Sequence, residues 1–278
     1  MVAELISVGT EILLGNIVNT NAAYLAEKCA LLGLSLYHQS VVGDNEARME
    51  DTIRRALERS DVVILTGGLG PTKDDLTKEV TAKVFKKALC EDAHTKERIM
   101  EFFQKIHNGE KITENNWKQA LIPEGAIIVE NQNGTAPGLI VIGDEGSGYE
   151  GKRAILIPGP PNECIPMFET QIAPYLSGFQ PEGIYSSMVK VCAIGESRAE
   201  TMVADLMDAQ TNPTLAPYAK TGEVHFRVTA KAKDEESAKC LMAPMLEELK
   251  KRFGDHIYTT KEEVTLEEAV IQMLEERK

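Results

Sequence analysis

The sequence predicts an α/β protein with a doubly wound, mostly parallel sheet and a second, smaller α+β domain. The first half of the chain alternates strand-like and helix-like segments, and helical crossovers imply parallel strands with right-handed connections. Residues 62–65 form a short, apolar, β-branched run, which is typical of a strand buried on both faces. Composition changes across the Gly- and Pro-containing residues 177–183, which predict a linker. We therefore expect domains at residues 1–177 and 178–260, with a linker helix at 261–278.

The elements of the first domain follow from apolar periodicity. Residues 22–32 are expected to be helical because Leu25 and Cys29 fall on one apolar face, where Cys29 would pack in the core. The Gly- and acid-rich residues 143–152 predict an exposed hairpin connection. In order, the expected strands are residues 4–8, 34–42, 62–65, 126–129, 139–142 and 154–157, and the expected helices are residues 22–32, 46–59, 77–87, 94–108 and 162–176.

The second domain reads as a small βαββα unit. Its expected elements are a strand at 184–193, a helix at 196–207, strands at 214–219 and 223–232, and a helix at 235–253. Residues 266–276 predict an acidic amphipathic helix that belongs to the linker.

Composition excludes several classes of protein. The chain has 278 residues and a formal net charge of −13, which argues against a nucleic-acid surface. No apolar run approaches the roughly 20 residues of a membrane span, and the N-terminus has no basic region of a signal peptide. The five cysteines include no CxxC pair and fit a reducing compartment. We expect a cytoplasmic protein without membrane or nucleic-acid partners.

The most informative segment is residues 66–77, Thr-Gly-Gly-Leu-Gly-Pro-Thr-Lys-Asp-Asp-Leu-Thr. Three glycines after a buried strand let the backbone turn tightly and approach a ligand, and in a doubly wound sheet this loop lies where ligands bind. The motif is neither a Walker A loop nor a dinucleotide fingerprint. The alternative is a tight strand-to-helix turn in which Asp74 or Asp75 only complements the helix dipole.

Two other strands are followed by polar segments. Residues 9–21 contain Glu11, Asn16 and Asn21, and a helix cap by Asn19 or Thr20 would leave these three side chains unexplained. Asp44 follows the second strand, where it or Asn45 could simply cap the next helix.

Three parallel strands therefore deliver carboxylates to one edge of the sheet: Glu11, Asp44, and Asp74 or Asp75. Oxygen ligands of this kind suit Mg²⁺ or Mn²⁺ together with substrate phosphates. The histidines show no metal-ligand spacing, so a zinc site is not expected, and the chain lacks the Gly-x-Ser-x-Gly elbow of a serine hydrolase. Polar or turn-forming clusters at residues 114–120, 133–138 and 158–161 can each be read as plain loops. Trp117 could stack on a base, although a single tryptophan more often packs in the core or on the surface.

Together these segments resemble the CinA family of competence/damage-inducible proteins. The likeness rests on Gly-Thr-Glu-Ile-Leu-Leu-Gly-Asn-Ile-Val-Asn-Thr-Asn, Val-Val-Gly-Asp, the glycine loop, Asn-Gly-Thr-Ala-Pro-Gly and Pro-Gly-Pro-Pro-Asn-Glu, in matching order. Cys164 and Trp117 depart from that pattern, where methionine and arginine are usual. The resemblance implies a molybdopterin-binding-protein-like first domain, in which Asp44 and Asp75 match the functional acids, and a KH-like second domain.

The resemblance also implies an activity, the hydrolysis of ADP-ribose to AMP and ribose 5-phosphate in pyridine-nucleotide recycling. It implies dependence on Mg²⁺, Mn²⁺ or Co²⁺, with K⁺ as a further candidate. Deamidation of nicotinamide mononucleotide is not expected, because the chain ends where that domain would begin. The expected catalytic residues are Asp75, Asp44 and Glu11, and the expected metal ligands are Asp75, Asp44 and Asp74. Substrate contacts are expected from Thr10, Asn16, Asn21, Gly67, Gly68, Gly70, Thr72, Lys73, Asn115, Gln119, Gly134, Thr135, Gly159 and Pro160.

Two other classes of function stay open at this point. The same acidic site fits a pterin- or nucleotide-binding module with little or no catalysis. RNA binding is the weaker alternative, because the KH-like domain has no Gly-x-x-Gly between helices and is not basic. We expect a homodimer, since related folds often assemble.

Overall fold

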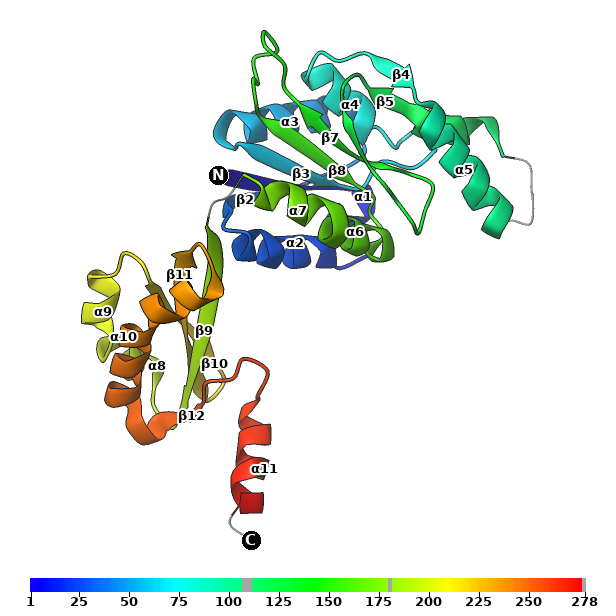
Figure 1. The fold of residues 1–278 in the computed structure, drawn as a ribbon. Helices are drawn as coiled ribbons and strands as arrows, with labels where there is room; N and C mark the ends of the chain where they lie inside the picture. The colour runs from blue at the N-terminus through cyan, green and yellow to red at the C-terminus, as the bar shows by residue number, and fades with distance from the viewer. Residues whose placement is uncertain (107–111, 180–181, 277–278) are drawn as a thin grey trace. The chain divides into compact units, whose positions relative to one another are not determined.

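The computed structural model describes residues 1–106, 112–179 and 182–276. The chain divides into two compact units, Met1–Gln180 and Pro181–Lys278 (Figure 1). In the described part of the chain, no helix is long and apolar enough to span a membrane.

The first unit is built on a six-stranded sheet in the order β2-β1-β3-β8-β7-β6. Strands β2, β1, β3 and β8 run parallel to one another, whereas β7 runs antiparallel to both β8 and β6. The predicted α/β class with a mostly parallel sheet is thus confirmed. The strands in spatial order are β2 (Ser35–Val42), β1 (Val2–Val8), β3 (Val62–Thr66), β8 (Arg153–Ile157), β7 (Gly138–Ile142) and β6 (Ile127–Val129).

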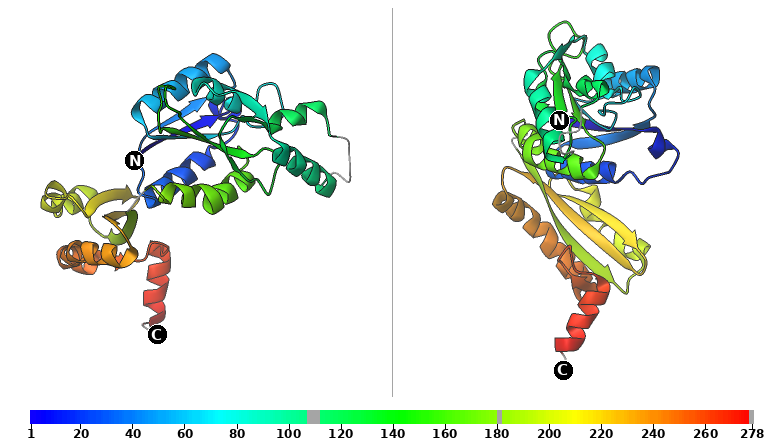
Figure 2. Two further views of the ribbon diagram at one scale, coloured as in Figure 1. Left: turned by 45° about the horizontal axis from the view of Figure 1, so that its top comes forward. Right: turned by 90° about the vertical axis from the view of Figure 1, so that its right-hand side faces the viewer.

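Helices cover both faces of this sheet (Figures 1 and 2). One face packs against α3 (Glu46–Arg59) and α4 (Thr77–Val84). The other face packs against α2 (Thr20–Leu31) and the continuous helical segment formed by α6 (Pro161–Met167), a π turn (Phe168–Ile172) and α7 (Ala173–Ser177).

Strand β3 shows why the prediction from residues 62–65 succeeds. Val63 and Leu65 belong to the core on the α3 side, and Val62 and Ile64 belong to the core on the α2 side. Every one of these four side chains is fully buried. Cys29 packs in the second of these cores, as its helical position predicts.

The region between β3 and β6 departs most from the prediction. Helix α4 ends at Val84 rather than residue 87, because Lys86 adopts a left-handed φ of 56° and the chain then enters β4 (Leu89–Glu91). Strand β4 pairs with β5 (Leu121–Pro123). Such three-residue strands are too short to carry periodicity. Helix α5 (Ala93–Ile106) and the 3₁₀ segment η1 (Glu114–Ala120) complete the region, and the predicted helical residues 107 and 108 lie outside the described residues.

The second unit has an antiparallel sheet in the order β10-β11-β9-β12. Phe226 of β11 and Phe253 of α10 stack in its core with ring centroids 4.8 Å apart. The predicted helix at 196–207 is divided into α8 and α9, and the short β12 was not predicted. The elements are β9 (Gly183–Cys192), α8 (Glu196–Thr201), α9 (Ala204–Asp208), β10 (Thr214–Lys220), β11 (Glu223–Ala232), α10 (Glu235–Phe253), η3 (Gly254–His256), β12 (Ile257–Thr259) and α11 (Leu266–Glu276).

Candidate functional site

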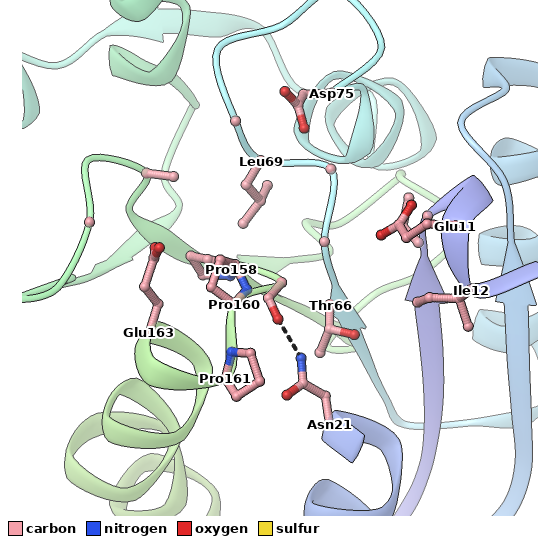
Figure 3. A pocket seen from close by; sticks show the side chains of 18 of the residues that line it. Glu11, Ile12, Asn21, Thr66, Leu69, Asp75, Pro158, Pro160, Pro161 and Glu163 are labelled. Carbon is pink, nitrogen blue, oxygen red and sulfur yellow. Dashed lines mark hydrogen bonds between the residues drawn. The ribbon is translucent and has the colours of Figure 1, made fainter. Parts of the chain in front are cut away.

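A cleft of about 710 Å³ lies at the carboxyl edge of the first sheet (Figure 3). Loops that follow β1, β2, β3 and β8 form most of its wall. Residues 133–136, Phe102 of α5 and Gln119 of η1 complete it. Its volume falls within the range of small-molecule sites, and its position is where ligands bind in open α/β sheets.

Asp44 is held in the cleft by Thr10, which is the first residue of the short helix α1 (Thr10–Leu13). The Thr10 N–H and hydroxyl both donate to Oδ2 of Asp44, at 3.0 and 2.7 Å. Within the described residues, Oδ1 of Asp44 accepts no hydrogen bond. This arrangement fixes the carboxylate and leaves one oxygen for a ligand.

Asp75 is held in a similar way by Thr72. The Thr72 N–H donates to Oδ2 of Asp75 at 2.9 Å, and the Thr72 hydroxyl donates to the same oxygen. Gly70 lies beneath the carboxylate, since a Cβ at this position would be 2.5 Å from Oδ2. In the part of the chain that the structure describes, Oδ1 of Asp75 accepts no hydrogen bond.

The capping interpretations of the aspartates do not hold. Helix α4 has Leu76 at its N-cap and no side-chain cap, so neither Asp74 nor Asp75 serves in that role. Asn45, rather than Asp44, accepts the N–H of Arg48 and caps α3. Neither Asp44 nor Asp75 therefore caps the helix that follows it. That Asp74 or Asp75 complements the dipole of α4 stays the alternative to a ligand.

A pair of lysines braces the Asp75 loop from the side of η1. Lys118 Nζ donates to the carbonyl oxygens of Thr72, at 2.8 Å, and of Asp75. Lys78, only 5% exposed, donates through Nζ to the carbonyl of Lys118. Burial lowers the pKa of Lys78 to about 8. The loop that carries Asp75 thus depends on contacts from about 40 residues further along the chain.

The remaining acids lie in the same cleft. Glu11 lines it, and its carboxylate occupies the space beside Gly9 that a Cβ would fill. Asp74 also lines it. No three His, Cys, Asp or Glu side chains among the described residues lie close enough together to hold a metal ion. The predicted set of Asp44, Asp74 and Asp75 is therefore not gathered as three protein ligands of one ion.

The glycine loop contributes fewer free N–H groups than we expected. The Gly67 N–H donates to Ile157, and the Thr72 N–H donates to Asp75, so neither is free for a phosphate oxygen. Gly67 and Gly68 have φ values of +97° and +66°, and their missing Cβ atoms leave room for Val8 and Thr77. The N–H groups of Gly68 and Gly70 have no hydrogen-bond partner among the described residues.

Two amides present unpaired acceptors in this region. Gln119 lines the cleft, is 2% exposed, and its Oε1 has no hydrogen-bond partner in the described part of the chain. Asn21 donates through Nδ2 to the Gly159 carbonyl at 2.7 Å, and its buried Oδ1 is likewise unpaired there (Figure 3). Because a buried acceptor without a donor is costly, these oxygens favour a ligand that brings donors.

The structure brings most of the predicted contact residues to the cleft. Those that line it are Asn21, Gly67, Gly68, Gly70, Gln119, Gly134, Thr135, Gly159 and Pro160. Five others are not part of its lining: Thr10, Asn16, Thr72, Lys73 and Asn115. Thr10 and Thr72 instead support the aspartates, whereas Asn16, Lys73 and Asn115 are exposed. Trp117 is also absent from the lining.

Glu163 and Phe102 line the cleft but were not predicted. Glu163 follows the strand β8 through the Pro158–Pro161 turn, so its position after a strand end was an available signal. Phe102 lies on α5, and nothing in its sequence pattern distinguishes it from a core position.

The ionisable side chains that line the cleft, among the described residues, are all acidic. The described residues that line it include five carboxylates, Glu11, Asp44, Asp74, Asp75 and Glu163, but no Lys, Arg or His. A phosphate group entering this cleft would meet negative charge, so it needs an accompanying cation.

The comparisons with known proteins assign the class of both units. Residues 4–178 match the family described as "Probable molybdopterin binding domain", and residues 186–259 match "Damage-inducible protein CinA KH domain". The first unit is thus a domain of the molybdopterin-binding type, and the second is a KH domain. The chain belongs to the CinA family.

Individual relatives agree with this assignment. The chain is 50% identical over 277 residues to each of two CinA-like proteins, from Dictyoglomus turgidum and Dictyoglomus thermophilum, with 100% of this chain covered. The solved structure of the protein CinA with unknown function from Thermoplasma acidophilum is 36% identical, with a TM-score of 0.54, covering 62% of this chain and 97% of that one. The chain spans 65% of the length of each Dictyoglomus relative.

Proposed function

We propose that the first unit hydrolyses the pyrophosphate of ADP-ribose to AMP and ribose 5-phosphate with the help of a divalent cation, in the cytoplasm. The observation that carries this proposal is the cleft itself, with five carboxylates, no basic side chain among its described residues and unpaired amide acceptors. A nucleotide fits this combination if its phosphates arrive with a cation and its sugar and base bring hydrogen-bond donors.

The donor set fits a divalent ion of the Mg²⁺, Mn²⁺ or Co²⁺ kind. Asp44 and Asp75 each have one carboxylate oxygen fixed by a threonine and another without a hydrogen bond among the described residues. Mg²⁺ is commonly held by one or two carboxylates, with water and substrate phosphates as its other ligands. The lack of a cluster of three or more His, Cys, Asp or Glu side chains among the described residues is therefore compatible with Mg²⁺. A bound ion would neutralise charge on the pyrophosphate and lower the pKa of a water molecule.

The roles of the chain's own residues follow from their positions. Asp44 and Asp75 would hold the ion, because Thr10 and Thr72 keep them in place before a ligand arrives. The N–H groups of Gly68 and Gly70, which are unpaired among the described residues, would donate to phosphate oxygens. Glu11 and Asp74 would complete the acidic wall. The unpaired Oε1 of Gln119 would accept a hydrogen bond from the nucleoside.

Replacement of Asp75 by Asn tests this proposal. The change keeps the size of the side chain and its contact with Thr72 but removes the charge, so AMP release from ADP-ribose with Mg²⁺ should fall by at least about 100-fold. Asp51→Asn is the matched control, since Asp51 is an exposed residue of α3 whose carboxylate pairs with Arg55. Full AMP release by the folded Asp75→Asn variant would remove the assignment.

A pterin- or nucleotide-binding module with little catalysis is the second candidate, because the acidic cleft and its orphan acceptors suit binding as well as hydrolysis. Incubation of the wild-type protein with ADP-ribose and Mg²⁺, Mn²⁺ or Co²⁺ separates the two. Ligand binding without any AMP would favour the module. The homodimer and a role for K⁺ stay predictions.

A further inference from the structure

Glu163 is the carboxylate of the cleft that stands apart from the others. In the view of Figure 3 it rises from α6 at the left, whereas Glu11 lies at the right and Asp75 at the top. It lies in the first turn of α6, directly after the Pro158–Pro161 turn, and is half-buried. Its backbone N–H donates to Pro160, which anchors its position.

One carboxylate oxygen of Glu163 is fixed by a hydrogen bond from Asn131. Asn131 donates through Nδ2 to Glu163 Oε2 at 2.6 Å and to the Ala136 carbonyl at 2.8 Å. The Oδ1 atom of Asn131 accepts the Asn133 N–H at 3.0 Å, so this buried amide cannot turn without losing contacts. Gly134 lies against the carboxylate, where any Cβ would overlap it.

The other oxygen, Oε1, accepts no hydrogen bond within the described residues. Burial raises the pKa of Glu163, which the hydrogen bond from Asn131 opposes. A partly desolvated carboxylate with a free oxygen is stabilised by donors, and hydrogen bonds to a charged acceptor are stronger than neutral ones. Glu163 is therefore built to meet donors that a ligand brings.

Chemistry limits which part of a nucleotide could donate hydrogen bonds to Glu163. Phosphate offers only acceptors at neutral pH and would be repelled, so Glu163 should face an uncharged part of the ligand. The edge of a purine presents donors beside acceptors, which an amide such as Gln119 matches better than an acceptor-only carboxylate. A vicinal diol can donate both of its hydroxyl hydrogens, and acidic side chains bind ribose hydroxyls in dinucleotide sites.

We propose that Glu163 recognises the vicinal diol of a ribose in the bound nucleotide and makes the cleft selective for ribose over 2-deoxyribose. This inference rests on the proposed function only in taking a ribonucleotide as ligand. It also holds for a nucleotide-binding module without catalysis.

Titration calorimetry in Mg²⁺ with two matched ligand pairs tests the inference and identifies the ribose. The first pair is AMP and 2′-deoxy-AMP, and the second is ribose 5-phosphate and 2-deoxyribose 5-phosphate. In the wild type, one pair should show a preference of about tenfold or more for the ribose form, about 1.4 kcal/mol. That preference should fall to about twofold in Glu163→Gln, which loses the charge, and in Glu163→Asp, which withdraws the carboxylate.

Glu124→Gln is the control, because it removes the same charge from an exposed residue outside the cleft and should keep the full preference. An unchanged preference in both folded Glu163 variants would overturn the inference, as would equal affinities within both pairs in the wild type. Binding of inosine monophosphate, which differs from AMP in the base, tests whether Glu163 contacts the base instead. If Glu163→Gln abolishes the discrimination between AMP and inosine monophosphate but not that between ribose and deoxyribose, Glu163 contacts the base and the inference fails.

The separate assay of AMP release from ADP-ribose keeps this inference distinguishable from the proposed function. A ribose preference that depends on Glu163, without hydrolysis by the wild type, would remove the pyrophosphatase and leave the inference standing. Hydrolysis by the wild type without a ribose preference that depends on Glu163 would support the pyrophosphatase and contradict the inference. A wild-type protein that binds none of the four ligands would contradict the inference as well.

Discussion

Thr72 offers a direct test of how the candidate metal site is organised. Its hydroxyl and N–H are the two groups that hold Oδ2 of Asp75. Thr72→Val keeps the shape of the side chain and the N–H but removes the hydroxyl, so Asp75 should leave its position more often. A hydrogen bond to a charged group contributes about 1.5–3 kcal/mol, and solvent exposure places this one at the lower end.

A loss of about 1.4 kcal/mol corresponds to about tenfold in rate. We therefore expect AMP release from ADP-ribose to fall about tenfold in Thr72→Val, with a higher Mg²⁺ concentration needed for half-maximal rate. Thr72→Ser retains the hydroxyl and should stay within about twofold of the wild type. Mn²⁺ binding followed by electron paramagnetic resonance gives a readout that does not depend on turnover. Equal rates and equal Mn²⁺ affinities in Thr72→Val and the wild type would refute the positioning role.

Three further predictions follow from other contacts. Gly134→Ala should push Glu163 aside and weaken about tenfold the binding of whichever ligand shows the ribose preference, AMP or ribose 5-phosphate, as measured by calorimetry. Gly195→Ala, whose Cβ meets open space, should not. Burial lowers the pKa of Lys78 from 10.5 to about 8, so the unfolded chain keeps that proton longer. The urea-unfolding free energy of the wild type relative to Lys78→Met should hence rise by up to about 3 kcal/mol between about pH 8 and about pH 10.5. Glu163 has the opposite sign: its raised pKa costs stability as pH rises through it, so Glu163→Gln should unfold at higher urea near neutral pH but not near pH 4.

The centre of the sheet could be predicted from the sequence because strands such as β3 and β8 contain continuous apolar runs. Val62–Leu65 is buried on both faces, and a continuous apolar run is the pattern that such a strand requires. The same reasoning fails for β4 and β5. Each has only three residues, and their extended conformation depends on pairing with each other rather than on a pattern in their own sequence. Strand β12 was missed for the same reason, since its three residues are defined by pairing with β9, which is distant in the sequence.

The candidate site could be predicted only to the level of loops. The parallel strands β1, β2 and β3 bring Glu11, Asp44 and Asp75 to one edge, which follows from topology alone. Which loop residues line the cleft depends on side-chain directions that topology does not determine. Lys73 shows the limit, because it lies between the cleft-lining residues Pro71 and Asp74 and is nevertheless exposed.

Thr10 and Thr72 differ in how far their contacts with the aspartates could be predicted from the sequence. Thr72 and Asp75 are three residues apart, a spacing at which a hydroxyl and a carboxylate often bond within one turn. Thr10 and Asp44 are 34 residues apart, and they meet only because β1 and β2 are neighbours in the sheet. Both residues were expected to touch substrate, yet both use their donors on a carboxylate. A threonine beside an acid in such a loop should therefore first be tested as the support of that acid, since a fixed carboxylate binds a cation with less loss of entropy.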